Sequence, residues 1–216
     1  MHKFIELLES QLGYAERSSG YTKFGQWYNT VEFDADYSTA PWCDMYLSWA
    51  AKKLGYEDWV GQFAYTVYHA KWFRQQDAWG TVPKPGAIVF FDWSGGRKID
   101  GIDHVGIVTR VEGGRIHTIE GNIDGGVAKR KVRDTDKVVG YGYPEKIKAR
   151  LDEEAAQQQE IITASRPDNS VALTRTPDLL SQAPPVTVRE NLPPSPPVRT
   201  GPKHAKPETG AHAKAP

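Results

Sequence analysis

The chain contains one cysteine, and the residues around it favour nucleophilic chemistry. Cys43 follows Pro41, which suits the first turn of a helix because its missing N–H is not needed there. The unpaired N–H groups of a first turn and the helix dipole stabilise an anion, so we expect this position to lower the pKa of the thiol. The alternative is an inert thiol, because a lone cysteine is most often a small hydrophobic residue of the core.

A thiol nucleophile needs a base, and the base needs an acceptor that orients it. His104 is the candidate base because it opens the apolar strand segment Val105–Val108 and can face a cleft from that position. The other five histidines are expected to be peripheral, at the surface or satisfied by hydrogen bonds: His2, His69, His117, His204 and His212.

The orienting acceptor depends on the register of a β-hairpin. A two-residue turn at Gly113-Gly114 would place His104 on the opposite face of the sheet from Glu120 and Asn122. A three-residue loop, or an equivalent bulge, would instead place Gly106 across from Glu120 and His104 across from Asn122. We predict this second register, in which an acid and an amide can reach the imidazole.

The elements that position these residues follow from the apolar pattern. Helical spacing predicts helices over about 4–12, 41–54 and 63–75, with a loop-rich connection over 14–40. After Gly86 the pattern changes to five short strands, over 87–93, 103–112, 115–121, 127–133 and 138–143. Helices followed by strands indicate an α+β domain in which N-terminal helices pack on a C-terminal antiparallel sheet of about five strands.

The composition changes along the chain. All the aromatic residues lie between Phe4 and Tyr143, whereas 11 of the 15 prolines fall after residue 151. A segment without aromatic residues buries too little apolar area to offset its chain entropy. We therefore expect a globular domain over 1–145, a short solvated helix over 146–165 and a Pro-rich disordered tail over 166–216.

Composition also excludes several classes of protein. The 27 basic and 27 acidic side chains balance, so no whole-chain field attracts nucleic acid or an anionic membrane. No run of about 18 apolar residues occurs to span a bilayer. Glu6 and Glu9 interrupt the apolar stretch that a secretory signal peptide would need. One cysteine excludes an internal disulfide framework and multi-cysteine metal sites. We expect the protein to be a monomer.

Four motifs resemble those of the CHAP domain, the cysteine, histidine-dependent amidohydrolases and peptidases that cut bacterial peptidoglycan. They occur in the family's order: Ala40–Asp44, Pro85–Phe91, Asp103–Val108 and Ile119–Asn122. The resemblance covers roughly residues 1–145 and implies a papain-like α+β fold. It also implies that Cys43 is the nucleophile and that His104 is the general base, which then protonates the leaving amine. In the same resemblance Glu120 orients the imidazolium and Asn122 is an auxiliary polar residue.

The function that this resemblance implies is hydrolysis of an amide bond in peptidoglycan. The enzyme would be an N-acetylmuramoyl-L-alanine amidase or an endopeptidase of the stem peptide or its bridge. It would act at the bacterial cell wall after export, or after release by lysis as for a phage-encoded lysin. Two alternatives stay open: an inactive wall-binding module, and a thiol hydrolase of a different amide, such as a toxin effector or a small-peptide amidase.

Three further features carry weaker predictions. Asp34 and Asp36 resemble the opening of a calcium loop, and some CHAP domains hold calcium just before the nucleophile; a solvated acidic turn is the alternative. Calcium is thus a candidate cofactor, although the reaction requires none. Trp42, next to the nucleophile, is a candidate wall of the substrate cleft. The basic strand Lys129–Lys131 with Arg133 is expected to be a solvated sheet edge.

Overall fold

The computed structural model describes residues 1–165, so the tail expected over 166–216 lies outside the described residues. Helices come first: α1 (His2–Glu9), α2 (Lys23–Tyr28), α3 (Cys43–Leu54), α4 (Glu57–Val60) and α5 (Thr66–Gln75). A short 3-10 helix, η1 (Ile99–Gly101), lies among the strands β1 (Trp79–Gly80), β2 (Ile88–Phe91), β3 (His104–Glu112), β4 (Arg115–Ile123), β5 (Val127–Arg133) and β6 (Val138–Gly142). Helix α6 (Pro144–Ala164) follows the last strand.

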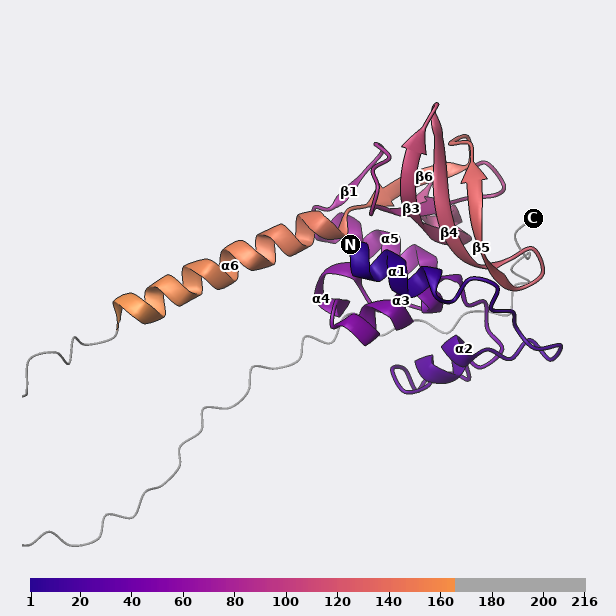
Figure 1. Cartoon of the computed structure of the whole chain (residues 1–216), viewed down its shortest axis with the longest axis horizontal. Helices are drawn as coiled ribbons and strands as arrows, with labels where there is room; N and C mark the ends of the chain where they lie inside the picture. The colour runs from indigo at the N-terminus through magenta and orange to yellow at the C-terminus, as the bar shows by residue number, and fades with distance from the viewer. Residues whose placement is uncertain (166–216) are drawn as a thin grey trace, which may run out of the picture.

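The strands form one antiparallel sheet in the order β1-β6-β2-β3-β4-β5. Helices α1, α3 and α5 gather against one side of it (Figure 1). The α+β, papain-like class predicted from the sequence is therefore confirmed. The sheet has six strands rather than about five because β1, only two residues long, pairs with β6.

Two hydrophobic clusters cover the two faces of the sheet. The main core lies between the helices and the sheet and includes Val105 and Ile107 of β3. A smaller cluster covers the other face and is formed by Ala87, Val89, Phe91, Val108, Ile116, Val138 and Tyr141. Because side chains alternate along a strand, neighbouring residues of β3 serve different clusters.

Helix α3 supplies the centre of the main core. It ends at Gly55, whose φ of 69° gives the left-handed C-cap that glycine adopts without strain. Lys52 and Lys53 in the last turn complement the helix dipole, and Asp44 does the same in the first turn. These signals place the start of the helix, and hence Cys43, at a defined point beside the sheet.

The connection expected over 14–40 contains a helix that the sequence pattern did not predict. Helix α2 begins after Thr22, whose hydroxyl accepts a hydrogen bond of 2.9 Å from the N–H of Gly25. A Cβ at Gly25 would lie 2.1 Å from the carbonyl oxygen of Tyr37, so this glycine lets the two segments approach. The helix has only six residues, too few to give a clear apolar period.

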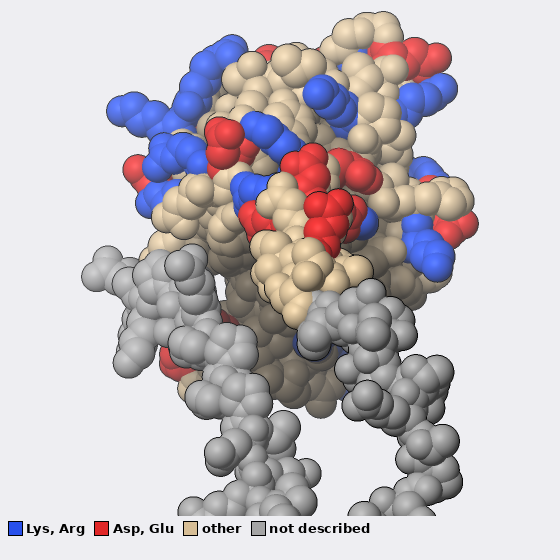
Figure 2. Space-filling model, turned by 90° about the vertical axis from the view of Figure 1, so that its left-hand side faces the viewer, with Lys and Arg blue, Asp and Glu red and all other residues tan. Residues whose placement is uncertain are grey.

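Helix α6 leaves the globule as a single rod (Figure 1). Pro144 and Ile147 in its first turn are buried, and Arg150 donates a hydrogen bond of 2.8 Å to the carbonyl of Gln76. Residues 152–165 are exposed. None of the helices within residues 1–165 is long and apolar enough to cross a membrane. Acidic and basic side chains are interspersed on the face shown in Figure 2.

Candidate active site

Cys43 is the first residue of α3 and is buried, with 4% of its surface exposed. Its thiol faces backbone N–H groups of Cys43, Asp44 and Val105, which favour a thiolate. Burial and the neighbouring carboxylate of Asp44 outweigh these groups and raise the pKa of the Cys43 thiol to about 12. The expectation that the helix start lowers this pKa is therefore wrong, because desolvation is the larger effect here.

His104 and Glu120 form a direct contact inside the protein. Nε2 of His104 lies 2.9 Å from Oε2 of Glu120, and the two side chains are 3% and 0% exposed. The imidazole ring lies 5.8 Å from the ring of Phe91 and 5.5 Å from that of Trp93. Strands β3 and β4 thus bring together two of the residues singled out in the sequence.

A bulge in β3 sets the register that makes this contact. The turn has two residues, with Glu112 opposite Arg115, so the three-residue loop is wrong. The register shifts between Val108 and Arg110, and beyond this point Gly106 pairs with Glu120. The equivalent bulge, which was the other form of the prediction, is confirmed.

Glu120 has two partners besides His104. Arg133 binds both carboxylate oxygens, with Nε 3.0 Å from Oε1 and Nη2 2.7 Å from Oε2, and the hydroxyl of Thr118 donates to Oε1. Burial by itself would raise the pKa of Glu120, but the hydrogen bonds from His104 and Arg133 lower it to about 2. Glu120 is therefore a fixed carboxylate that only accepts hydrogen bonds.

Sequence reasoning missed Arg133, which it assigned to a solvated strand edge. Strand β5 does lie at the end of the sheet, but the Arg133 side chain is only 14% exposed. A buried carboxylate needs a cation to offset its desolvation, and Glu120 was expected to be part of a site. Because side chains alternate along a strand, Lys129, Lys131 and Arg133 share one face of β5, and Lys129 pairs with Glu120. This alternation was the signal that could have linked Arg133 to Glu120.

Cys43 and His104 approach the start of β3 from different sides. Cys43 belongs to the main core, whereas the His104 ring contacts Phe91 and Trp93 of the cluster on the other face. One of the backbone N–H groups that the sulfur faces belongs to Val105, the residue after His104. Within residues 1–165 no hydrogen bond joins the thiol to the imidazole.

Asn122 is not joined to this pair. The pairing of β3 with β4 ends at Gly106 and Glu120, so Asn122 has no ladder partner in β3. Its φ of 59° is in the left-handed region, which asparagine tolerates better than most residues. The structure places Asn122 two residues beyond Glu120, and its side chain makes no hydrogen bond within the described part of the chain.

Trp42 does not line an open cleft. Its side chain is fully buried and stacks on Phe24 with ring centroids 5.2 Å apart. Its indole N–H donates to Oε2 of Glu16 at 3.2 Å. The prediction that Trp42 is a cleft wall is wrong, because the residue before the helix start points into the core.

The carboxylates of Asp34 and Asp36 do not fit a calcium site. Asp34 accepts a hydrogen bond of 2.7 Å from the Tyr37 hydroxyl. Asp36 accepts from the N–H of Ser38 at 2.9 Å and from the amide of Asn29 at 3.1 Å. No group of three His, Cys, Asp or Glu residues that could hold a metal occurs within residues 1–165. The geometry is that of an acidic turn closed by its own hydrogen bonds.

A second buried pair includes Asp44, the residue after Cys43. Nδ1 of His69 is 2.8 Å from Oδ1 of Asp44, and Nε2 is 2.8 Å from the carbonyl oxygen of Val60. A carbonyl only accepts, so Nε2 carries a proton and the pair shares one further proton between Asp44 and Nδ1. This pair connects the first turn of α3 to α5. Both ring nitrogens of His69 have partners in the core, which is one of the two outcomes expected for this histidine.

Residues 35–122 match the family model of the CHAP domain. This segment includes Cys43, His104, Glu120 and Asn122. The match supports a CHAP domain in this segment, as the four motifs predicted, and the CHAP family comprises peptidoglycan amidases and peptidases.

Two other comparisons add little to this result. No curated protein matches the chain. Among solved structures, "The crystal structure of Ly7917" is 19% identical, with a TM-score of 0.40, over 66% of this chain and 62% of that chain. The present chain thus spans less than two thirds of that chain's length.

Proposed function

We propose that the protein is a thiol-dependent hydrolase that cleaves an amide bond of bacterial peptidoglycan. One observation carries the proposal. Within the CHAP segment, a buried His104–Glu120 pair lies next to the N–H of Val105, one of the backbone groups that the Cys43 sulfur faces. Cys43 is the nucleophile, His104 the general base and Glu120 the residue that orients the imidazole. Asn122 is an auxiliary polar residue at the end of the same strand.

The ionised Glu120 carboxylate defines which nitrogen of His104 acts. Because this carboxylate only accepts, the neutral imidazole keeps its proton on Nε2 and has a lone pair on Nδ1. Nδ1 removes the proton from Sγ as the sulfur attacks the amide carbonyl, since a thiol with a pKa of about 12 is not ionised beforehand. Glu120 stabilises the imidazolium that forms, and the Cys43 backbone N–H is the candidate donor to the oxyanion.

The second half of the reaction returns each group to its starting state. The imidazolium gives its proton to the departing amine nitrogen as the C–N bond breaks, which leaves a thioester on Sγ. His104 then removes a proton from a water molecule, which attacks the thioester carbonyl and releases the carboxylic acid. The proton returns to Sγ and restores the thiol.

The substrate amide is either the bond between the muramic lactyl group and the first alanine or a bond within the stem peptide or its bridge. On this proposal the enzyme works at the cell wall as a monomer, and residues 1–145 form its catalytic domain. One observation favours a second candidate, an inactive wall-binding module: Cys43 is 4% exposed and no hydrogen bond joins it to His104 within the described residues. On that alternative the protein binds walls without cutting them.

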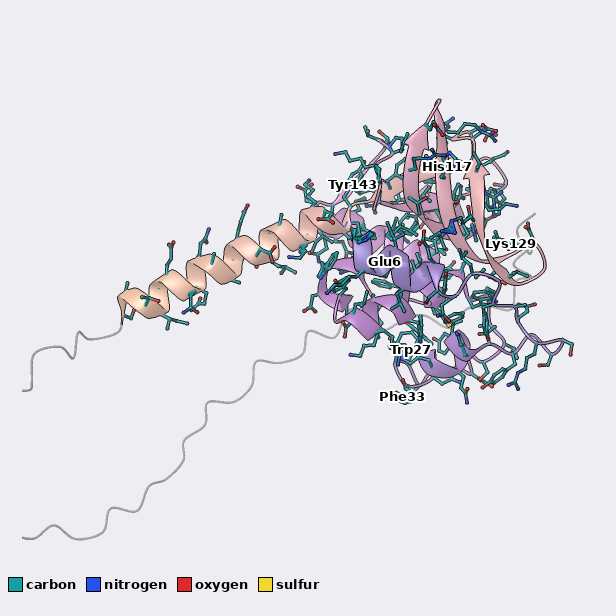
Figure 3. All side chains as sticks on the ribbon, viewed as in Figure 1. Glu6, Trp27, Phe33, His117, Lys129 and Tyr143 are labelled. Carbon is teal, nitrogen blue, oxygen red and sulfur yellow. The ribbon has the colours of Figure 1, made fainter. Side chains whose placement is uncertain are left out.

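Digestion of purified sacculi tests the proposal. We expect the protein to clear a sacculus suspension and to release new amino groups, and Cys43→Ser and His104→Ala to lower the rate by at least about 100-fold. The His104 result is judged against His117→Ala, which removes a part-exposed histidine of β4 (Figure 3) and should leave the rate unchanged. Mass spectrometry of the released muropeptides identifies the bond.

Two outcomes would contradict the proposal. Undiminished clearing by folded Cys43→Ser would exclude the thiol mechanism. Binding to sacculi by the unmodified chain, with no release of new amino groups, would establish the inactive wall-binding module. Turnover of a soluble amide without any action on sacculi would instead indicate a hydrolase of a different substrate.

A further inference from the structure

Arg133, the last residue of β5, makes the strongest polar contact to the candidate site from outside it. Its guanidinium binds both oxygens of Glu120, at 3.0 Å and 2.7 Å. This two-point geometry fixes the plane of the carboxylate, which a lysine ammonium could not do. The other basic side chains of β5 are used elsewhere: Lys129 and Lys131 bind Asp124, and Arg130 binds Glu9.

Aromatic rings hold the guanidinium in this orientation. Arg133 lies over the ring of Trp93, 4.7 Å from its centroid, and 5.9 Å from that of Phe91. The same two rings contact the imidazole of His104. Trp93 and Phe91 therefore pack against both His104 and Arg133, two of the side chains that bind Glu120.

The four hydrogen bonds to Glu120 divide its charge. Oε2 accepts from His104 and Arg133, and Oε1 accepts from Arg133 and Thr118. If His104 were the sole cationic partner, this buried carboxylate would stabilise the imidazolium strongly. Arg133 already offsets the charge of Glu120, so the carboxylate stabilises an added proton on His104 less than it otherwise would.

The other charged groups around His104 are few. Asp103 precedes His104 and accepts a hydrogen bond of 3.3 Å from the backbone N–H of Trp93. Asp92 is the residue before Trp93, at the other end of the same loop. Cys43 lies across the start of β3 as a neutral thiol. Lys129 pairs with Glu120 in the ladder, but its ammonium binds Asp124 at 3.0 Å. Glu120 and Arg133 are thus the two charges that bear most directly on the imidazole.

We propose that Arg133 is a positioning residue of this site, which fixes the Glu120 carboxylate against His104 and offsets its charge. The inference rests on the proposed function, because the orientation and charge of this carboxylate matter only if His104 removes the Cys43 proton. Arg133 does not touch the reacting atoms and acts through Glu120.

The pH dependence of turnover tests this role. In Arg133→Gln we expect the acidic limb of the kcat/KM profile on muropeptide substrate to move up by roughly one pH unit, because a neighbouring cation is lost. Arg133→Lys keeps the charge but not the two-point contact, so it should keep the limb in place and lower kcat. Arg130→Gln, the same change three residues earlier in β5, is the matched control and should alter neither quantity.

A measurement without substrate separates this inference from the proposed function. The ring signal of His104, followed by NMR in the full chain as pH is varied, should reach its midpoint at higher pH in Arg133→Gln. It should move the opposite way in Glu120→Gln, where an anion is lost. If Arg133→Gln does not fold, Arg133→Lys is measured instead. Because lysine keeps the positive charge, the His104 midpoint in Arg133→Lys should equal that of the unmodified chain.

The outcomes are distinguishable. A uniform loss of rate in Arg133→Gln with both the limb and the His104 midpoint unmoved would mean a merely structural role and would overturn the inference alone. If the unmodified chain cleaves no wall amide, the proposed function fails; a His104 midpoint that still moves in Arg133→Gln would then support the coupling of Arg133 to His104 through Glu120.

Discussion

At the scale of single residues, the state of the Cys43 thiol follows from two opposing effects. The helix start supplies N–H groups that stabilise a thiolate, but burial removes the water that would otherwise solvate it. The nearby carboxylate of Asp44, itself fully buried, adds to the effect of burial. The resting Cys43 is therefore a neutral thiol, so on the proposed mechanism the base must act during attack.

Alkylation measures this state directly. At neutral pH we expect iodoacetamide to modify Cys43 at least about 100-fold more slowly in the folded chain than in the chain unfolded in guanidinium, where the thiol has its ordinary pKa. The rate in the folded chain should rise as pH approaches the thiol pKa of about 12. Mass spectrometry gives the labelled fraction, and Cys43→Ser is the blank. Equal rates in the two states would show that the folded thiol is accessible and has an ordinary pKa.

At the scale of elements, the β3–β4 hairpin determines which side chains meet. The bulge at Thr109, whose hydroxyl donates to the carbonyl of His117 at 3.1 Å, shifts the register so that Gly106 lies opposite Glu120. A Cβ at Gly106 would lie 2.7 Å from Cγ of Glu120. The missing side chain leaves space for Glu120 to extend across β3 to His104.

Gly106→Ala tests this close approach. The added methyl group would also lie 3.0 Å from the carbonyl oxygen of Ile119, so the hairpin must shift. We expect a loss of about 1–3 kcal/mol in the free energy of unfolding, measured with denaturant, and a lower rate on sacculi. Val111→Ala, at a part-exposed position of the same strand, should change stability by no more than about 0.5 kcal/mol. Stability and rate unchanged in Gly106→Ala would mean that Glu120 does not need this space.

At the scale of the whole molecule, the Glu120 contacts join three strands beneath a small hydrophobic cluster. His104, Glu120 and Arg133 come from β3, β4 and β5, and their side chains are largely buried together. Global unfolding separates them and returns Glu120 to water. Its low pKa in the folded state is therefore linked to the stability of the entire domain.

This linkage predicts sensitivity to acid. The pKa of Glu120 is about 2 when folded, below its ordinary value, so its contribution to stability is complete above pH ~4.3 and is lost as pH falls towards 2. The full contribution is on the order of 3 kcal/mol.

Denaturant unfolding at a series of pH values checks this prediction. Between pH ~4.3 and ~2 the unmodified chain should lose more stability than Glu120→Gln. Glu112→Gln, which changes an exposed glutamate, should follow the unmodified chain. The same slope for Glu120→Gln and the unmodified chain would mean that this carboxylate is not linked to folding.

The amino-acid sequence determined the order of the elements and where the candidate site residues lie within them. Apolar periodicity and capping signals are local, so they placed Cys43 at the start of a helix and His104 at the start of a strand. The alternation of side chains also limited the hairpin to two registers. The predicted register, with Gly106 opposite Glu120, is the one observed, although a bulge and not a three-residue loop produces it.

Only the tertiary structure decided which side chains are buried and what they touch. Arg133 meets Glu120 across a strand ladder, His69 meets Asp44 between two helices, and Trp42 packs into the core beside them. The direction of the Cys43 pKa shift was settled in the same way, because desolvation sums over every neighbour in space. Local patterns record spacing along the chain, whereas burial and ion pairing depend on contacts between segments far apart in it.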